Sequence, residues 1–269
     1  MIEISDINYR YGRQKNLFSN LNYSEKAGNI VGLLGKNGSG KSTLFKIISG
    51  LLSVKSGSVT TMGTEPFHRK PSFLNQLYFV PEEYHLPSIS IKHYVKAYSG
   101  LYPGFDAELL HQILADFELK ETMKLSRISY GQKKKFLIAF ALATNCKLLL
   151  FDEPTNGLDI PSKAIFRKVV ASSVKDDQLI IISTHQVRDI ENLIDKIVVI
   201  DNGKIIFNRE IYQISERYAF STVSSISDKN PLYTEVGPAG HRVILPLNGS
   251  STPVDIELLF NAIVKGVIL

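Results

Sequence analysis

The sequence predicts an α/β fold, in which helices cover a mainly parallel sheet. Short apolar runs bounded by turn residues recur along the chain, and stretches with helical spacing of apolar residues separate them. This alternation is typical of parallel strands joined by crossover helices. The run at 30–34 is apolar throughout, as expected of a strand buried on both faces. The expected strands are 30–34, 77–80, 148–151, 179–183 and 197–201.

Further strands are expected before and after this series. Ile2 and Ile4 alternate with polar residues, and 17–23 leads into a turn at 26–29. We interpret these segments as short antiparallel strands added to the same sheet. Later in the chain, the dipeptide at 202–203 is Asn-Gly and separates two apolar runs, which predicts a tight hairpin that closes the core.

Between these strands, residues of about 87–128 have a different pattern. Two groups of apolar residues recur at helical spacing, and Pro103-Gly104 interrupts the chain between them. The pattern predicts two amphipathic helices that form a subdomain inserted into the α/β core. The two groups are Ile91, Tyr94, Val95 and Tyr98, then Leu110, Ile113, Leu114 and Phe117.

The signals weaken after Phe207. The segment 252–255 resembles a helix start, and the apolar residues that follow it share one helical face, so we expect a terminal helix. The polar, serine-rich stretch 221–230 is interpreted as a loop or short linker. We expect a main domain of residues 1–208 and a small C-terminal extension of residues 209–269.

Composition indicates an ordinary globular chain. It has 269 residues, of which 44% are hydrophobic, and its longest apolar stretch, 136–143, is too short to cross a bilayer. The N-terminus lacks the features of a signal peptide, and the single cysteine, Cys146, cannot form an internal disulfide, so we expect a cytoplasmic protein. The net charge of +5 is spread along the chain, and the lysines at 133–135 lack interleaved aromatic residues, so nucleic acid is not an expected partner.

The most informative motif directly follows the strand at 30–34. A glycine-rich loop lets backbone N–H groups turn toward phosphate, and the opening helix adds the positive end of its dipole. Lys41 is expected to reach the β- and γ-phosphates, and Ser42 to coordinate magnesium. The motif predicts binding of a nucleoside triphosphate with magnesium. It consists of Gly35, Lys36, Asn37, Gly38, Ser39, Gly40, Lys41, Ser42 and Thr43.

A second motif ends the apolar strand at 148–151. Asp152 can orient magnesium and its waters, and Glu153 can polarise the water that attacks the γ-phosphate. A strand ending in acidic surface residues is the alternative interpretation, which Pro154 and the following 156–159 disfavour.

Together, these motifs give the sequence a resemblance to the ATPase subunit of ABC transporters, in register over residues 1–207. Five separated elements occur in the order of that family, which makes the resemblance specific. They are the loop 35–43, the segment 80–82 where a glutamine loop is expected, the signature-like 129–132, the pair 152–153, and 183–185.

The resemblance implies roles for individual residues. Tyr11 matches the aromatic position on which adenine stacks, with Tyr9 as the alternative. Glu82 occupies the place of the glutamine that senses magnesium and couples to the membrane subunit. His185 corresponds to the histidine that contacts the γ-phosphate and helps position the attacking water, and Asp159 to a residue at the dimer seam.

The resemblance also implies that the active form contains two ATPase subunits. Ser129, Gly131 and Gln132 open a helix, and in this family the N-terminus of that helix meets the phosphate of ATP bound by the opposite subunit. A complete site then exists only when two subunits close over two nucleotides. Hydrolysis weakens the grip of both subunits and the dimer reopens.

Two departures from the family pattern occur. The signature contains Tyr130 where the family usually has glycine, and Glu82 replaces a neutral amide with a carboxylate. Neither change removes Lys41, Asp152, Glu153 or His185, so we predict a subunit that hydrolyses ATP.

The implied cofactors are ATP and Mg²⁺; GTP is less favoured on family grounds alone. The implied partners are a second ABC ATPase subunit, identical or related, and a multispanning membrane permease subunit at the inner face of the cell membrane. The terminal segment 255–260 looks like the ending of exporter ATPases, so export is preferred to import. The alternative function is that of a soluble ABC ATPase without a transporter, such as an iron–sulfur cluster assembly ATPase.

Overall fold

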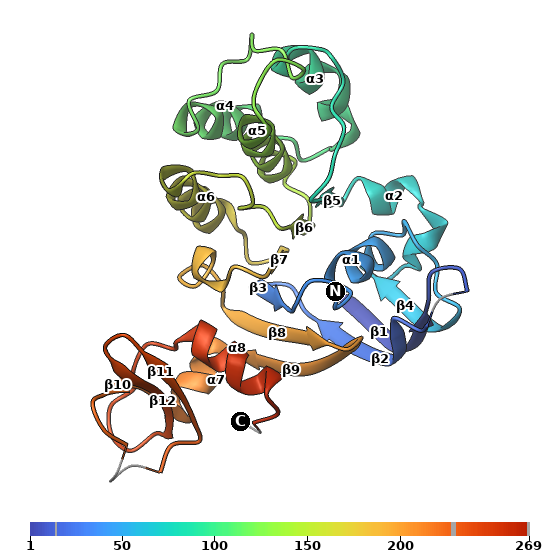
Figure 1. The fold of residues 1–269 in the computed structure, drawn as a ribbon. Helices are drawn as coiled ribbons and strands as arrows, with labels where there is room; N and C mark the ends of the chain where they lie inside the picture. Colours follow the sequence, from blue (N-terminus) through green and yellow to red (C-terminus); the bar gives the residue numbers. More distant parts are fainter. Residues whose placement is uncertain (14, 227–229, 268–269) are drawn as a thin grey trace.

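The computed structural model describes residues 1–13, 15–226 and 230–267, and a six-stranded sheet lies at its centre (Figure 1). The strand order is β5-β6-β7-β3-β8-β9, and every neighbouring pair is parallel except β8 and β9. The predicted strands and the Asn-Gly hairpin are therefore present. The strands are β3 (Asn29–Leu34), β5 (Leu77–Val80), β6 (Leu148–Asp152), β7 (Leu179–Thr184), β8 (Lys196–Asp201) and β9 (Lys204–Glu210).

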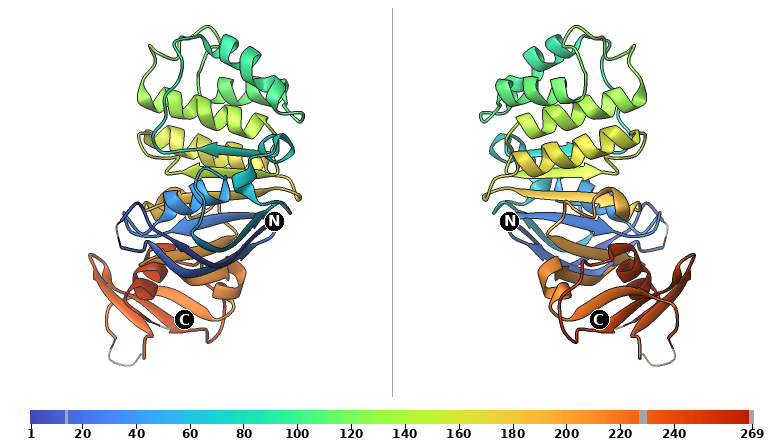
Figure 2. Two further views of the ribbon diagram at one scale, coloured as in Figure 1. Left: turned by 90° about the vertical axis from the view of Figure 1, so that its right-hand side faces the viewer. Right: turned by 90° about the vertical axis from the view of Figure 1, so that its left-hand side faces the viewer.

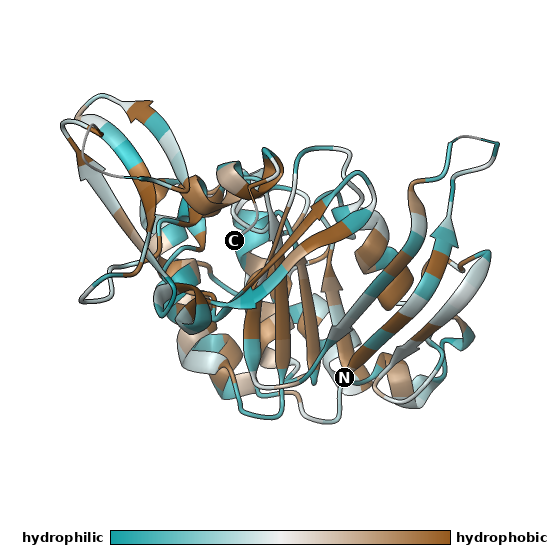
Figure 3. Ribbon diagram, turned by 90° about the horizontal axis from the view of Figure 1, so that it is seen from below, coloured by the Kyte–Doolittle hydropathy of each residue, from teal (hydrophilic) through white to brown (hydrophobic). Residues whose placement is uncertain are grey.

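The central sheet separates two hydrophobic cores, and successive residues of each buried strand contribute to opposite cores. In β3, Ile30 and Leu34 join one core, whereas Val31 and Leu33 join the other. Apolar residues accordingly run along the central strands in Figure 3. The first core lies under α5 and α6, and the second under α1. These helices are α1 (Lys41–Ile48), α5 (Tyr130–Ala143) and α6 (Ile160–Ser173).

The N-terminal strands form a sheet of their own, which corrects the expectation that they extend the central one. The order is β2-β1-β4, and both pairings are antiparallel. Ile2, Ile4 and Ile7 are buried in the second core, so this sheet covers α1. The third strand was not expected, because most of its residues are small or polar and half of them are exposed. The strands are β1 (Ile2–Tyr9), β2 (Phe18–Glu25) and β4 (Ser56–Thr61).

Two helices occupy the segment between β5 and α5, as predicted for 87–128, and they lie beyond α5 in both views of Figure 2. Ser90 and Asp106 cap them by accepting hydrogen bonds from the backbone three residues on. They are α3 (Ile91–Tyr98) and α4 (Ala107–Asp116), joined by η2 (Ser99–Leu101); η1 (Pro66–His68) and α2 (Pro71–Leu74) precede β5.

The C-terminal part contains the expected helix and also a small sheet that was not expected. The sheet order is β10-β12-β11, with antiparallel pairing. Residues 221–223 of the expected loop 221–230 belong to β10, and 227–229 lie outside the described residues. Each of these strands buries only one or two of its residues, so the regular alternation of buried and exposed positions typical of a strand is missing. The elements are α7 (Ile211–Ser215), β10 (Tyr218–Val223), β11 (Tyr233–Gly237), β12 (Gly240–Pro246) and α8 (Ile256–Val264).

The last helix packs on the turn η3 (Val187–Asp189), which follows β7. Ile256 and Leu259 are fully buried in the first core together with Ile190. At the surface, Arg188 Nη2 lies 2.7 Å from Glu257 Oε2. The C-terminal helix is therefore continuous with the main core. Among the described residues, no helix is long and apolar enough to cross a membrane.

The β8–β9 hairpin provides a stability prediction. Gly203 has a φ of +71°, and a Cβ there would lie 1.7 Å from Leu17 O. We expect Gly203→Ala to destabilise the protein by about 3 kcal/mol, because a strained backbone and a clash with backbone combine. Gly63→Ala is the matched control, since Gly63 has a φ of +74° with open space around it. Gly63→Ala should lower the free energy of unfolding by about 1 kcal/mol. Urea unfolding measures both, and equal losses would contradict the clash.

Candidate active site

A cavity of about 590 Å³ opens at the carboxyl ends of the central strands. Residues from the β1–β2 connection, the β3–α1 loop and the ends of β5, β6 and β7 surround it. Most of the predicted site residues therefore meet in one place. The lining residues are Tyr11, Lys15, Asn16, Leu17, Asn37, Gly38, Gly40, Lys41, Ser42, Thr43, Glu82, Glu153 and His185.

The β3–α1 loop has the backbone geometry of an anion cradle. Gly38 and Gly40 have φ angles of +80° and +109°, and a Cβ on Gly40 would lie 2.6 Å from Phe18 Cε1. Glycine is therefore required at position 40. No side chain caps α1, so the first N–H groups of this helix remain available to a ligand at the cavity. Within the part of the chain that the structure describes, the buried Ser39 Oγ has no hydrogen-bond partner.

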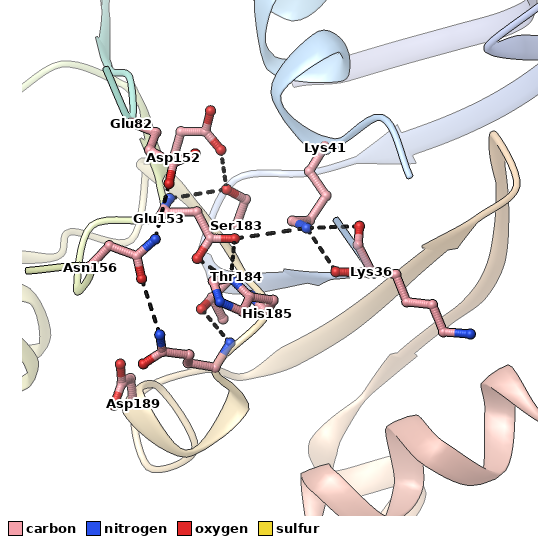
Figure 4. A network of polar contacts seen from close by, with 12 residues as sticks. Lys36, Lys41, Glu82, Asp152, Glu153, Asn156, Ser183, Thr184, His185 and Asp189 are labelled. Carbon is pink, nitrogen blue, oxygen red and sulfur yellow. Dashed lines mark hydrogen bonds and ion pairs between the residues drawn. The ribbon is translucent and has the colours of Figure 1, made fainter. Parts of the chain in front are cut away.

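Lys41 connects the loop to the acidic end of β6 (Figure 4). Its Nζ donates hydrogen bonds to Gly35 O at 2.7 Å and to Lys36 O at 3.3 Å, and it lies 3.8 Å from Glu153 Oε1. Burial lowers the pKa of Lys41, and the nearby carboxylates of Glu153, Asp152 and Glu82 oppose that shift. The ammonium group is thus held where it can meet a phosphate.

Asp152 is held in a fixed orientation at the end of β6. Its Oδ1 accepts a hydrogen bond of 2.5 Å from Ser183 Oγ, on the neighbouring strand β7. Both side chains are buried. The sequence motif that contains Ser183 does not indicate this role, because the hydrogen bond to Asp152 depends on the register of the two strands.

Glu153 and His185 form a pair at the cavity. His185 Nδ1 lies 2.9 Å from Glu153 Oε1, and the carboxylate is almost fully buried. Glu153 has a φ of +46°, which is unusual for a residue with a side chain. Its N–H donates to Ser183 O at 3.1 Å. The arrangement stores local strain at a site that can carry out chemistry.

Glu82 reaches the same cavity from the end of β5. Its Oε1 accepts a hydrogen bond of 3.1 Å from Asn156 Nδ2, and Asn156 Oδ1 accepts one of 3.3 Å from Gln186 Nε2. These bonds connect the loops after β5, β6 and β7 (Figure 4). The sequence motifs did not indicate the positioning of Glu82 by Asn156, which depends on contacts across loops.

Of the two candidate aromatic residues, only Tyr11 lines the cavity. This residue is 41% exposed, and its hydroxyl lies 3.0 Å from Thr43 Oγ1. Tyr9 is 7% exposed and meets the ring of Tyr11 edge to face at 5.1 Å. The geometry therefore favours Tyr11 as a stacking surface for a base.

The signature residues lie elsewhere. Ser129 caps α5 in a reciprocal arrangement, in which its hydroxyl accepts from Gln132 N and Gln132 Oε1 accepts from Ser129 N. Asp159 caps α6 by accepting a hydrogen bond of 2.9 Å from Ser162 N. Neither these residues nor Gly131 lines the cavity. A single chain thus presents its glycine-rich cradle and its signature helix at separate places.

Magnesium fits this site only together with a nucleotide. Over residues 1–13, 15–226 and 230–267, no group of three or more His, Cys, Asp or Glu side chains could hold a metal by itself. Ser42 offers a hydroxyl, and Asp152 and Glu82 offer carboxylates, which are the hard oxygen ligands that magnesium prefers. The remaining ligands would be phosphate oxygens and water.

Comparison with known proteins identifies the family. The family model described as ABC transporter matches residues 18–156, which is more than half of the chain. The chain belongs to the ABC transporter family. This match confirms the resemblance seen in the motifs, and with it ATP binding and ATPase activity.

The relatives of this ABC protein include ATP-binding proteins named for transport or export. It is 32% identical over 211 residues to the lantibiotic transport ATP-binding protein SrtF of Streptococcus pyogenes, covering 78% of this chain and 91% of SrtF. It is 28% identical over 251 residues to the Nod factor export ATP-binding protein I of Rhizobium etli, covering 90% and 79%. A solved ATP-binding subunit of an ABC transporter has 25% identity and a TM-score of 0.72, covering 80% and 91%. The predicted α/β fold is confirmed.

Proposed function

We propose that this ABC protein is the energy-coupling subunit of an exporter, which hydrolyses ATP while paired with a second ATPase subunit. The carboxylate of Glu153 carries the proposal, because it lines the cavity within reach of both Lys41 and His185. A buried carboxylate in this position can polarise a water molecule, and the histidine can keep that water in line with the γ-phosphate.

The other residues of the site have supporting roles in this proposal. Lys41 and the backbone N–H groups of 35–43 bind the phosphates, and Tyr11 stacks on adenine. Mg²⁺, held by Ser42, Asp152 and Glu82, would neutralise charge on the phosphates. The contacts of Ser183 with Asp152 and of Asn156 with Glu82 would orient these two carboxylates.

Pairing with a second subunit follows from the separation of cradle and signature. Ser129, Gly131 and Gln132 present the start of α5 away from their own cavity, so their proposed phosphate belongs to a nucleotide on the other subunit. Asp159 would lie at the seam. ATP then closes the pair, and hydrolysis reopens it. The second subunit would be identical or related to this chain.

The remaining proposals concern partners and location. A multispanning permease subunit would hold the protein at the cytoplasmic face of the membrane, and residues 1–208 would form the ATPase domain with 209–269 as an extension. The name of the Rhizobium relative contains export, which supports that direction. A non-transport ATPase is not favoured, because the relatives are named as transport proteins.

Affinity purification from detergent-solubilised membranes tests the proposed assembly. We expect a tagged protein to retain a multispanning subunit, identified by mass spectrometry, and an untagged strain provides the control. Recovery with cytosolic scaffold proteins alone would refute the transporter role.

A further inference from the structure

Tyr130, which replaces a glycine of the usual signature, is bound to the segment that carries Glu82. Its ring stacks on Tyr84, with centroids 5.5 Å apart and planes inclined by 17°. Two hydrogen bonds run in opposite directions between the two segments. Tyr130 OH donates to Glu82 O at 2.8 Å, and Tyr84 OH donates to Tyr130 O at 3.1 Å.

Lys134, one turn further along α5, strengthens this connection. Its side chain is fully buried, and its Nζ donates to Pro81 O at 3.4 Å and to Glu82 O at 3.3 Å. The ammonium group also lies 5.2 Å from the ring centroid of Tyr84 and 5.8 Å from that of Tyr130. Burial lowers the pKa of Lys134 to about 8, which leaves the amine mostly protonated at pH 7.

The loop after β6 packs against the same ring. A Cβ on Gly157 would lie 2.8 Å from Tyr130 Cδ1, and one on Gly131 would lie 2.7 Å from Gly157 O. Asn156 in this loop holds the Glu82 side chain. Two loops therefore meet the start of α5 at Tyr130, although this residue remains 47% exposed at the surface.

We infer that Tyr130 and Lys134 are positioning residues that clamp the Glu82 segment to the start of α5, and so couple the signature of this subunit to its own nucleotide cavity. The inference rests on the proposed function, in which the start of α5 meets a nucleotide bound by the second subunit. The clamp holds the carbonyl of Glu82, and the side chain of the same residue lines the cavity. A displacement of α5 would therefore move Glu82, and by reciprocity a ligand at Glu82 would bias α5.

Limited proteolysis without nucleotide tests the clamp itself. A glutamate-specific protease can cut after Glu82 or Glu83 when this segment loosens. We expect Tyr130→Gly and Lys134→Gln to raise the rate of that cleavage at least fivefold, and Tyr130→Phe, which keeps the stacked ring, to raise it less. Tyr98→Phe is the control, because Tyr98 lies on α3 and is similarly exposed. Unchanged cleavage in both Tyr130→Gly and Lys134→Gln would overturn the clamp.

The ATP dependence of hydrolysis tests the coupling. We expect a Hill coefficient above 1 for the unchanged protein, a value near 1 for Tyr130→Gly, and recovery of most of the difference in Tyr130→Phe. Faster cleavage with an unchanged Hill coefficient would overturn the coupling. Absence of hydrolysis in the unchanged protein would refute the proposed function instead, and the cleavage experiment would still decide whether the clamp exists.

Discussion

Glu153→Gln is expected to lower the rate of ATP hydrolysis by about 10²–10⁴-fold, because the amide cannot accept a proton from water. The amide keeps the size of the carboxylate and can still accept the hydrogen bond from His185 N, which reaches Glu153 Oε2 at 3.4 Å. ATP binding should therefore persist. Steady-state release of phosphate measures the turnover, and nucleotide titration measures the binding.

The control for this variant is Glu83→Gln. It removes an exposed carboxylate that directly follows the cavity-lining residue Glu82 in the sequence. It should retain near-normal turnover. Because Glu153→Gln slows the step that reopens the pair, a dimeric form of the variant should accumulate in the presence of ATP. Size-exclusion chromatography detects this dimer. If the variant turns over ATP at the rate of the unchanged protein, Glu153 is not the base.

Lys41→Ala is expected to weaken ATP binding by about 100-fold, because a hydrogen bond to a charged group contributes about 1.5–3 kcal/mol and this ammonium group would contact two phosphates. Loss of Lys41 also leaves Glu153 without its nearest cation, 3.8 Å away. Calorimetric titration with ATP and magnesium measures the change.

Lys36→Ala removes the same charge from the same loop and is the matched control. The Lys36 side chain is exposed and points away from Lys41 in Figure 4, and only its backbone carbonyl contacts the Lys41 ammonium group. Binding should change by less than about threefold, as for surface charges in general. Equal losses in the two variants would indicate that general electrostatic attraction, rather than a defined contact, accounts for the role of Lys41.

The central sheet was predictable because its strands are continuous apolar runs, as in 148–151. The β4 strand was not, because only Val59 and Thr61 are buried and the rest of the strand is small or polar. The small C-terminal sheet was missed for a similar reason. Each of its strands buries only one or two residues, a pattern that a polar loop also shows.

Within the site, the meeting of the cradle, Glu153 and His185 was predictable, because parallel strands bring their carboxyl ends to one edge. The contacts that fix these groups were not. Ser183 reaches Asp152 through strand register, and Asn156 reaches Glu82 across two loops. The environment of Tyr130 depends equally on packing between segments that lie far apart in the sequence.

The support of η3 by the last helix has a practical consequence for how this enzyme is handled. A fragment cut after β9 would keep every motif of the ATPase, yet lose the residues that pack beneath the turn following His185. The turn η3 would then lack its packing partner, so rates measured on the fragment would not represent those of the 269-residue chain. Kinetic measurements therefore require a protein that includes the C-terminal extension of residues 209–269.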